Sequence, residues 1–243
     1  MAPSRRNILM RSAVAVAFMC GLSSSFPVVK AQGLVSADLA RLRSVGGLAI
    51  SPDGRHIAYS VVLRDRPGRP YGQLWIMDVA SQKSSRIGSE NDRGGGPLWS
   101  PDGKSLAFQG SQAEQHGLFL AHADGSNVTF LAPMKGTNSP LPGAGEDVTW
   151  SPDGKQLAFI SSTPSEMVAE ASGDPMVISR YLYKPDAGEG MTRFNDNQRL
   201  HIFVVDVASK QVKQLTQGET DEHSINWSPD GKEILFVSNR EPN

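Results

Sequence analysis

Apolar side chains recur at every second position in several short runs of this chain, which predicts β-strands rather than helices. Four of the runs share one ten-residue pattern. In this pattern an apolar or aromatic residue precedes Ser-Pro-Asp-Gly, and a strand with apolar residues two positions apart follows. The four copies are residues 50–59, 99–108, 150–159 and 227–236. Each copy therefore predicts a β-hairpin.

The Ser-Pro-Asp-Gly segment has the composition of a tight turn. Proline fixes φ for the second position of a type I turn, and glycine adopts the left-handed conformation that other residues avoid. We expect a three-residue hairpin loop with a bulge. Because the aspartate and the glycine recur in every copy, we interpret both as structural rather than catalytic. These turn residues are Asp53, Gly54, Asp102, Gly103, Asp153, Gly154, Asp230 and Gly231.

A third and a fourth strand follow the hairpin in the first three copies. The predicted third strands are 74–79, 118–121 and 201–207, and the predicted fourth strands are 85–87, 128–131 and 212–216. Four antiparallel strands repeating every fifty or so residues are typical of a propeller blade. We therefore predict an all-β fold, a partial β-propeller of about three and a half four-stranded blades over residues 44–243. A β-sandwich is the alternative, but sandwich strands do not repeat their sequence in register.

Residues 1–31 have the pattern of an export signal peptide. Arg5, Arg6 and Arg11 precede an apolar run at 13–22, and small residues flank Lys30. A transmembrane helix is the alternative, but it needs roughly 20 apolar residues. The paired arginines also resemble a twin-arginine signal. We expect a bacterial protein exported to the periplasm or the medium, not held by a membrane after signal cleavage, with residues 32–43 leading into the propeller.

Composition and charge exclude several kinds of site. The one cysteine, Cys20, lies in the predicted signal, so the mature chain has no disulfide. Without the four basic residues of the signal, 20 basic side chains remain against 25 acidic ones, a net charge of −5 that argues against a nucleic-acid partner. The five histidines are not at metal-ligand spacing, and there is no glycine-rich phosphate loop. We therefore expect no metal and no cofactor.

The repeated Trp-Ser-Pro-Asp-Gly-Lys with its apolar strand resembles two families. One is the TolB-type propellers, and the other is the N-terminal propeller of the prolyl oligopeptidase family of serine peptidases. The resemblance covers nearly all of residues 44–243.

The third blade favours the peptidase family. Successive Ser-Pro-Asp-Gly serines are 49, 51 and 77 residues apart, so the third blade contains an insertion at about residues 162–199. Ser165 is a plausible cap for a short helix ending at Ala171. The stretch from Arg180 to Gly190 resembles the acylaminoacyl-peptidase and dipeptidyl-peptidase branch, whereas TolB-type blades lack a long insertion.

The resemblance implies a function for the insertion. In that family the propeller covers the mouth of an α/β-hydrolase domain and admits only short peptides. By position, Glu166 and Glu170 are candidates to bind a peptide's free amino terminus, and Arg180 and Lys184 to bind a peptide carboxylate. The alternative for each residue is a solvated surface charge.

The chain contains no catalytic residue that we can identify. No Gly-x-Ser-x-Gly nucleophile motif occurs in its 243 residues, so we expect no peptidase activity from the chain alone. We expect a second polypeptide to complete the ring, and the face of Ile234 and Phe236 to be exposed without it. The alternative function is a non-enzymatic, TolB-like periplasmic binding propeller.

Overall fold

The computed structural model describes residues 33, 35–137, 147–165, 198–238 and 240. The chain divides into two compact units, Met1–Asp38 and Leu39–Asn243. A four-residue helix, α2 (Ser36–Leu39), spans their boundary, and the backbone N–H of Val35 donates to the Asp38 carboxylate at 3.0 Å. All the described strands belong to the second unit.

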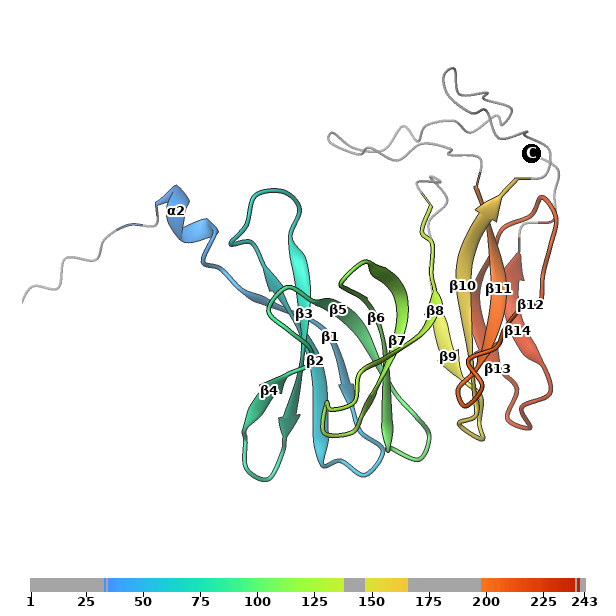
Figure 1. Ribbon diagram of the computed structural model, residues 1–243, viewed down its shortest axis with the longest axis horizontal. Coiled ribbons are helices and arrows are strands. Elements are labelled where there is room, and N and C mark those ends of the chain that lie inside the picture. The colour runs from blue at the N-terminus through green and yellow to red at the C-terminus, as the bar shows by residue number, and fades with distance from the viewer. Residues whose placement is uncertain (1–32, 34, 138–146, 166–197, 239, 241–243) are drawn as a thin grey trace, which may run out of the picture. The chain divides into compact units, whose positions relative to one another are not determined.

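The strands form antiparallel sheets in which chain neighbours are also sheet neighbours, as predicted for propeller blades (Figure 1). The first sheet contains β1 (Ser44–Ile50), β2 (His56–Leu63), β3 (Tyr71–Asp78) and β4 (Ser84–Arg86). The second contains β5 (Arg93–Trp99), β6 (Ser105–Gln112), β7 (Gln115–His122) and β8 (Thr129–Pro133). The third contains β9 (Val148–Trp150), β10 (Gln156–Pro164), β11 (Gln198–Asp206) and β12 (Val212–Gln214). The fourth contains β13 (Glu222–Trp227) and β14 (Ile234–Ser238). The fold class predicted from the repeat is confirmed.

Alternating apolar residues place a hydrophobic core between each sheet and the next. Leu74 and Ile76 of the first sheet pack with Phe108 and Phe119 of the second. Equivalent clusters join the second sheet to the third and the third to the fourth. The aromatic residue of the repeat also stacks on its cross-strand neighbour, with 5.6 Å between the ring centroids of Phe108 and Phe119. The buried apolar contacts of each sheet are therefore made mainly with the adjacent sheets.

The tryptophan before Ser-Pro-Asp-Gly links each sheet to the preceding one. The indole N–H of Trp99 donates to the carbonyl of Ala49 at 3.1 Å. Trp150 bonds Leu98 at 3.1 Å, and Trp227 bonds Thr149 at 3.3 Å, in the same way. Each acceptor lies two residues before the serine of its own repeat, so the contact has the same register at all three junctions.

The Ser-Pro-Asp-Gly loop differs in length from the prediction. Ser51 N donates to His56 O at 2.9 Å, so four residues lie in the loop instead of three. The Ser51 hydroxyl causes the difference, because it accepts the hydrogen bond of the His56 amide at 2.9 Å. The predicted left-handed glycine is present, with φ of +69° at Gly54.

The expected exposure of Ile234 and Phe236 is wrong. Both side chains are partly buried and pack against the core between the third and fourth sheets. The intervening residues, Leu235 and Val237, are 76% and 52% exposed. Side chains alternate between the two faces of a strand, so the wrong face for Ile234 exchanged the expected buried and exposed faces along all of β14.

Candidate functional site

The loops that connect the strands are alike from sheet to sheet at one end of the sheets and differ in length at the other end. At one end lie the Ser-Pro-Asp-Gly loop and the short turn between the third and fourth strands (Figure 1). At the other end, which we call the loop end, the second and third strands are joined by residues 64–70 in the first sheet, 113–114 in the second and 165–197 in the third. Function usually lies on variable connections that a rigid scaffold holds. The loop end is therefore the candidate functional end.

The Ser-Pro-Asp-Gly loops have one geometry in all four copies. In the second copy the Ser100 hydroxyl donates to Asp102 at 2.7 Å and accepts from the Ser105 amide at 3.0 Å. The Asp102 carboxylate also accepts from the Lys104 amide at 3.1 Å. Gly103 packs on Pro52 of the preceding loop, where an added Cβ would lie 3.3 Å from the proline Cδ. The loops therefore stack from sheet to sheet.

The turn aspartates are held in the ionised form. The serine hydroxyl, followed by a backbone amide, lowers the pKa of Asp102 below its ordinary value of 3.8. The same two donors lower the pKa of Asp53, Asp153 and Asp230. A low pKa makes a carboxylate a poor proton acceptor near neutral pH, so this chemistry suits a turn and not an acid–base catalyst.

At the loop end of the first sheet, Tyr71 lies beneath two arginines. The guanidinium carbons of Arg66 and Arg93 lie 5.2 Å and 5.6 Å from its ring centroid. The Tyr71 hydroxyl donates to Asp65 at 2.8 Å, and burial together with this carboxylate raises the pKa of Tyr71. The cluster therefore gathers two guanidinium groups and the Asp65 carboxylate around one aromatic ring.

A shallow groove between the first and second sheets is lined by glycine. Its volume is about 480 Å³. Its glycines are Gly72, Gly94, Gly95, Gly96, Gly110 and Gly117. Close packing between the sheets requires one of them: a Cβ on Gly72 of the first sheet would lie 2.8 Å from the Gly94 carbonyl oxygen of the second. Gly72 thus serves the contact between the two sheets. The polar side chains of the groove are those of Ser60, Arg93, Gln109, Ser111 and His116.

A buried polar cluster joins the third and fourth sheets at the loop end. His201 and Glu222 are 2% and 1% exposed, and His201 Nδ1 lies 2.8 Å from Glu222 Oε2. Hydroxyls of Thr216 and Thr220 each donate to this carboxylate at 2.9 Å, and that of Ser238 at 3.2 Å. A buried charge needs this number of donors to offset its lost hydration.

Sequence reasoning did not identify this cluster. His201 appeared only as part of a predicted strand, and Glu222 was not singled out. No local motif marks the pair, since the two residues are 21 positions apart and meet only when the fourth sheet packs on the third.

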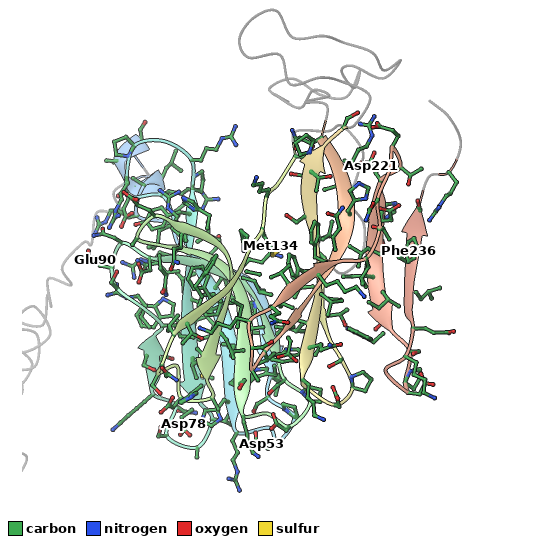
Figure 2. All side chains as sticks on the ribbon, turned by 45° about the vertical axis from the view of Figure 1, so that its right-hand side comes forward. Asp53, Asp78, Glu90, Met134, Asp221 and Phe236 are labelled. Atoms are coloured by element: carbon green, nitrogen blue, oxygen red, sulfur yellow. The ribbon has the colours of Figure 1, made fainter. Side chains whose placement is uncertain are left out.

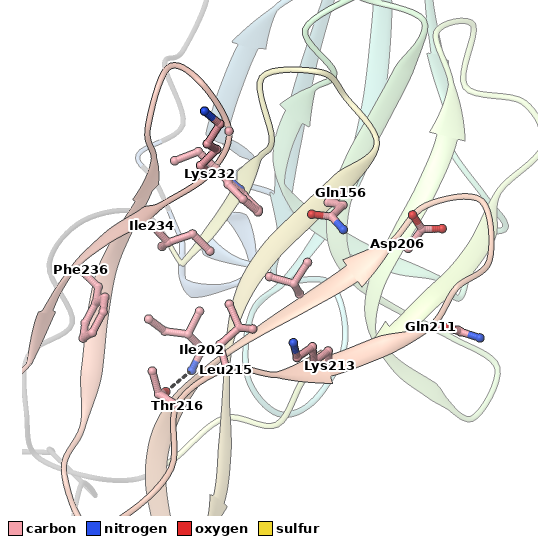
Figure 3. A pocket seen from close by; sticks show the side chains of 13 residues that line it. Gln156, Ile202, Asp206, Gln211, Lys213, Leu215, Thr216, Lys232, Ile234 and Phe236 are labelled. Carbon is pink, nitrogen blue, oxygen red and sulfur yellow. Dashed lines mark hydrogen bonds between the residues drawn. The ribbon is translucent and has the colours of Figure 1, made fainter.

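Beside this cluster lies a cavity between β11, β12 and β14 with a mixed apolar and polar lining (Figure 3). Its volume is about 570 Å³, and Ile202, Leu215, Ile234 and Phe236 are among its lining residues. Lys213 and Lys232 are also among the lining residues. The cavity lies beside the fourth sheet, which has two described strands where the other sheets have four.

The peptide-binding candidates Glu166, Glu170, Arg180 and Lys184 lie outside the described residues, as does the short helix expected after Ser165. The strands that flank them are described. β10 continues to Pro164 and β11 begins at Gln198, with Pro164 paired to Gln198. The connection of the third sheet is therefore 165–197.

The described residues contain no group of three histidine, cysteine, aspartate or glutamate side chains placed to hold a metal ion. Among the same residues, no helix has the length and apolar character needed to cross a bilayer.

Sequence comparison relates the chain to peptidases and to TolB-like proteins. It is 27% identical to the uncharacterized peptidase YuxL of Bacillus subtilis, over 85% of this chain and 31% of that protein. It is 23% identical to dipeptidyl-peptidase 5 of Porphyromonas endodontalis, over 83% of this chain and 30% of the peptidase. It is 27% identical to a TolB homolog of Chlorobium luteolum, over 78% of this chain and 37% of the homolog. The chain spans about a third of the length of each relative. No family model matches it.

Solved structures show the same fold. The chain superposes on an acylaminoacyl peptidase in complex with Z-Gly-Gly-Phe-chloromethyl ketone with a TM-score of 0.56 and 14% identity, over 82% of this chain and 28% of the other. For acylaminoacyl peptidase of Pyrococcus horikoshii the TM-score is 0.53 with 13% identity, over 76% of this chain and 27% of the other. The fold and relatives match the predicted resemblance to peptidase-family and TolB-like propellers.

Proposed function

We propose that this chain is the propeller part of an exported serine peptidase of the prolyl oligopeptidase type. In this proposal the loop end faces an α/β-hydrolase domain, and the propeller restricts entry to short peptides. The chain supplies no nucleophile and has no peptidase activity by itself. Its location is the periplasm or the medium.

The connection 165–197 carries the proposal. It makes the loop end of the third sheet far longer than that of the second, where residues 113–114 suffice. The two relatives named as peptidases, YuxL and dipeptidyl-peptidase 5, each align over more than four-fifths of the chain. A long connection on a rigid sheet is a common site for substrate contacts. Glu166, Glu170, Arg180 and Lys184 remain the candidate peptide ligands within it.

The match to a TolB homolog supports a second function, a periplasmic binding propeller without enzymatic activity. This function also uses the loop end, but it needs no hydrolase domain. It predicts binding without hydrolysis.

We also propose that further propeller strands cover the outer face of the first sheet and the outer face of the fourth sheet. These strands come from a second polypeptide or from the same protein. Val45, Leu48 and Ile50 of the first sheet are 63%, 59% and 60% exposed. Leu235 and Val237 are exposed on the fourth sheet. Closing the ring is how propellers remove such open faces and edges.

The test compares this chain with the complete product of its gene. Both are assayed with dipeptidyl and aminoacyl chromogenic amides, with and without a serine-directed phosphonate. The peptidase proposal expects inhibitor-sensitive turnover from the complete product and none above buffer from the chain. A complete product that binds short peptides in calorimetry but does not cleave them would establish the binding-propeller function instead.

A further inference from the structure

One carboxylate contacts residues at both ends of the connection 165–197. Glu219 lies in the loop between β12 and β13 (Figure 2 labels Asp221, two residues further along). The Ser165 hydroxyl donates to Glu219 Oε2 at 2.7 Å. Arg199 Nη2 lies 2.6 Å from the same oxygen. Ser165 is the first residue of the connection, and Arg199 is the second residue of β11 after it.

The arginine is held in a fixed orientation. Its side chain is 5% exposed, and Nε donates to the Glu219 backbone carbonyl at 2.9 Å while Nη2 contacts the Glu219 carboxylate. A third contact runs from Nη1 to the Gln198 carbonyl at 3.3 Å. A guanidinium with several bonds to one residue fixes both position and angle, which a lysine does not.

The loop between β12 and β13 takes the place of an edge strand beside residues 200–202 of β11. β12 pairs only with Phe203, Val204 and Val205. Beyond it, the Ile202 amide donates to Thr216 Oγ1 at 3.0 Å and the Leu200 amide to the Asp221 carboxylate at 2.9 Å. The side chains of Thr216 and Asp221 therefore continue the ladder toward the end of the sheet.

We infer that Glu219 is a positioning residue, a clamp that ties both ends of the connection 165–197 to the junction of the third and fourth sheets. The nine-pair ladder of β10 and β11 aligns the two strands. Glu219 then fixes Ser165, directly after β10, and Arg199, at the start of β11, to a loop that belongs to neither strand. The packing of the fourth sheet thereby sets where the connection leaves the propeller. The inference deepens the proposed function, because it names the residue that positions the proposed peptide-binding connection.

Hydrogen–deuterium exchange on the intact chain tests the clamp. Glu219→Gln keeps the size of the side chain and removes its charge. We expect exchange to accelerate at least about tenfold in two separate peptides, one ending at Ser165 and one beginning at Gln198, while peptides of the first and second sheets keep their rates. Glu233→Gln is the matched control, because Glu233 is an exposed glutamate in the hairpin loop between β13 and β14. It should change neither peptide.

A second pair of variants separates the clamp from general loosening. Ser165→Ala should accelerate exchange at the β10 end alone, and Arg199→Lys should retain part of the protection that Arg199→Ala loses. Acceleration at only one end in Glu219→Gln, or equal acceleration throughout the chain, would overturn the inference. Because no peptide is added, a failed clamp is distinguishable from a failed proposal of peptide gating.

Discussion

The indole N–H of Trp150 donates to the carbonyl oxygen of Leu98, 3.1 Å away on the neighbouring sheet. This bond is one of three equivalent links between successive sheets, and each acceptor carbonyl lies in or beside a packed core. A hydrogen bond between two sheets contributes free energy of its own, so the indole nitrogen contributes beyond the packing of its ring.

Trp150→Phe should lower the free energy of unfolding by about 0.5–1.5 kcal/mol, because it removes the hydrogen bond to the Leu98 carbonyl while keeping an aromatic ring in the core. Trp75→Phe is the matched control. Trp75 Nε1 is buried and has no hydrogen-bond partner among the described residues, so its removal should be neutral or stabilising. Urea unfolding measures both. Equal destabilisation by the two variants would show that the rings, and not the indole bonds, hold the sheets together.

Gly154→Ala should destabilise the chain by about 1–2 kcal/mol through backbone conformation alone. Gly154 has φ of +70°, and its added Cβ would lie at an ordinary contact distance of 3.6 Å from Pro101 Cδ. Gly95→Ala controls for the loss of a glycine, since a Cβ there meets nothing within 4 Å and the backbone is outside the left-handed region. Thermal unfolding of the two variants side by side gives the answer, and a Gly154→Ala protein as stable as Gly95→Ala contradicts it.

Glu222 should make the free energy of unfolding depend on pH in the acidic range. Burial by itself raises the pKa of Glu222, but hydrogen bonds from His201, Thr220 and Thr216 outweigh burial and hold the pKa below its ordinary value of 4.5. A carboxyl whose pKa is lower in the folded state stabilises the fold above its unfolded pKa. That stabilisation is lost as pH falls through the folded pKa.

Glu222→Gln should therefore be less stable than wild type at pH 7, and the difference should shrink as pH falls below about 4.5. Urea unfolding at a series of pH values measures it. Glu233→Gln, which removes an exposed carboxylate, should show no such trend. A stability difference that stays constant down to pH 3 would mean that the Glu222 charge does not contribute.

The fold was predictable because its information is local and repeated. Each Ser-Pro-Asp-Gly loop closes through its own serine and aspartate, as Ser100 and Asp102 do. Strand order follows directly, since every strand pairs with its neighbour in sequence. What failed was the face of β14, because Leu235 and Val237 are apolar like Ile234 and Phe236, so that the sequence does not show which of the two faces is buried.

The loop-end clusters were not predictable for a different reason. Arg199, Glu219 and Glu222 have no common spacing, and they meet through the packing of the fourth sheet on the third. The candidates that sequence did provide, Glu166 and Lys184 among them, lie outside the described residues. Sequence therefore located the long connection, and the structure located what holds its ends.

The exposed apolar faces of the first and fourth sheets should make the isolated chain, residues 32–243, associate with itself. Fully burying one large apolar side chain contributes about 1.5–3 kcal/mol, and Leu235 and Val237 leave most of that unused on an open sheet. Light scattering coupled to size exclusion should show mass rising with protein concentration. Leu235→Lys combined with Val237→Lys should reduce this association, because two charges on the face oppose its burial. Lys213→Glu, a charge change on the edge strand β12 of the third sheet, should leave it unchanged. A wild-type chain that stays monomeric at all concentrations would show that these faces are tolerated in water and need no covering strands.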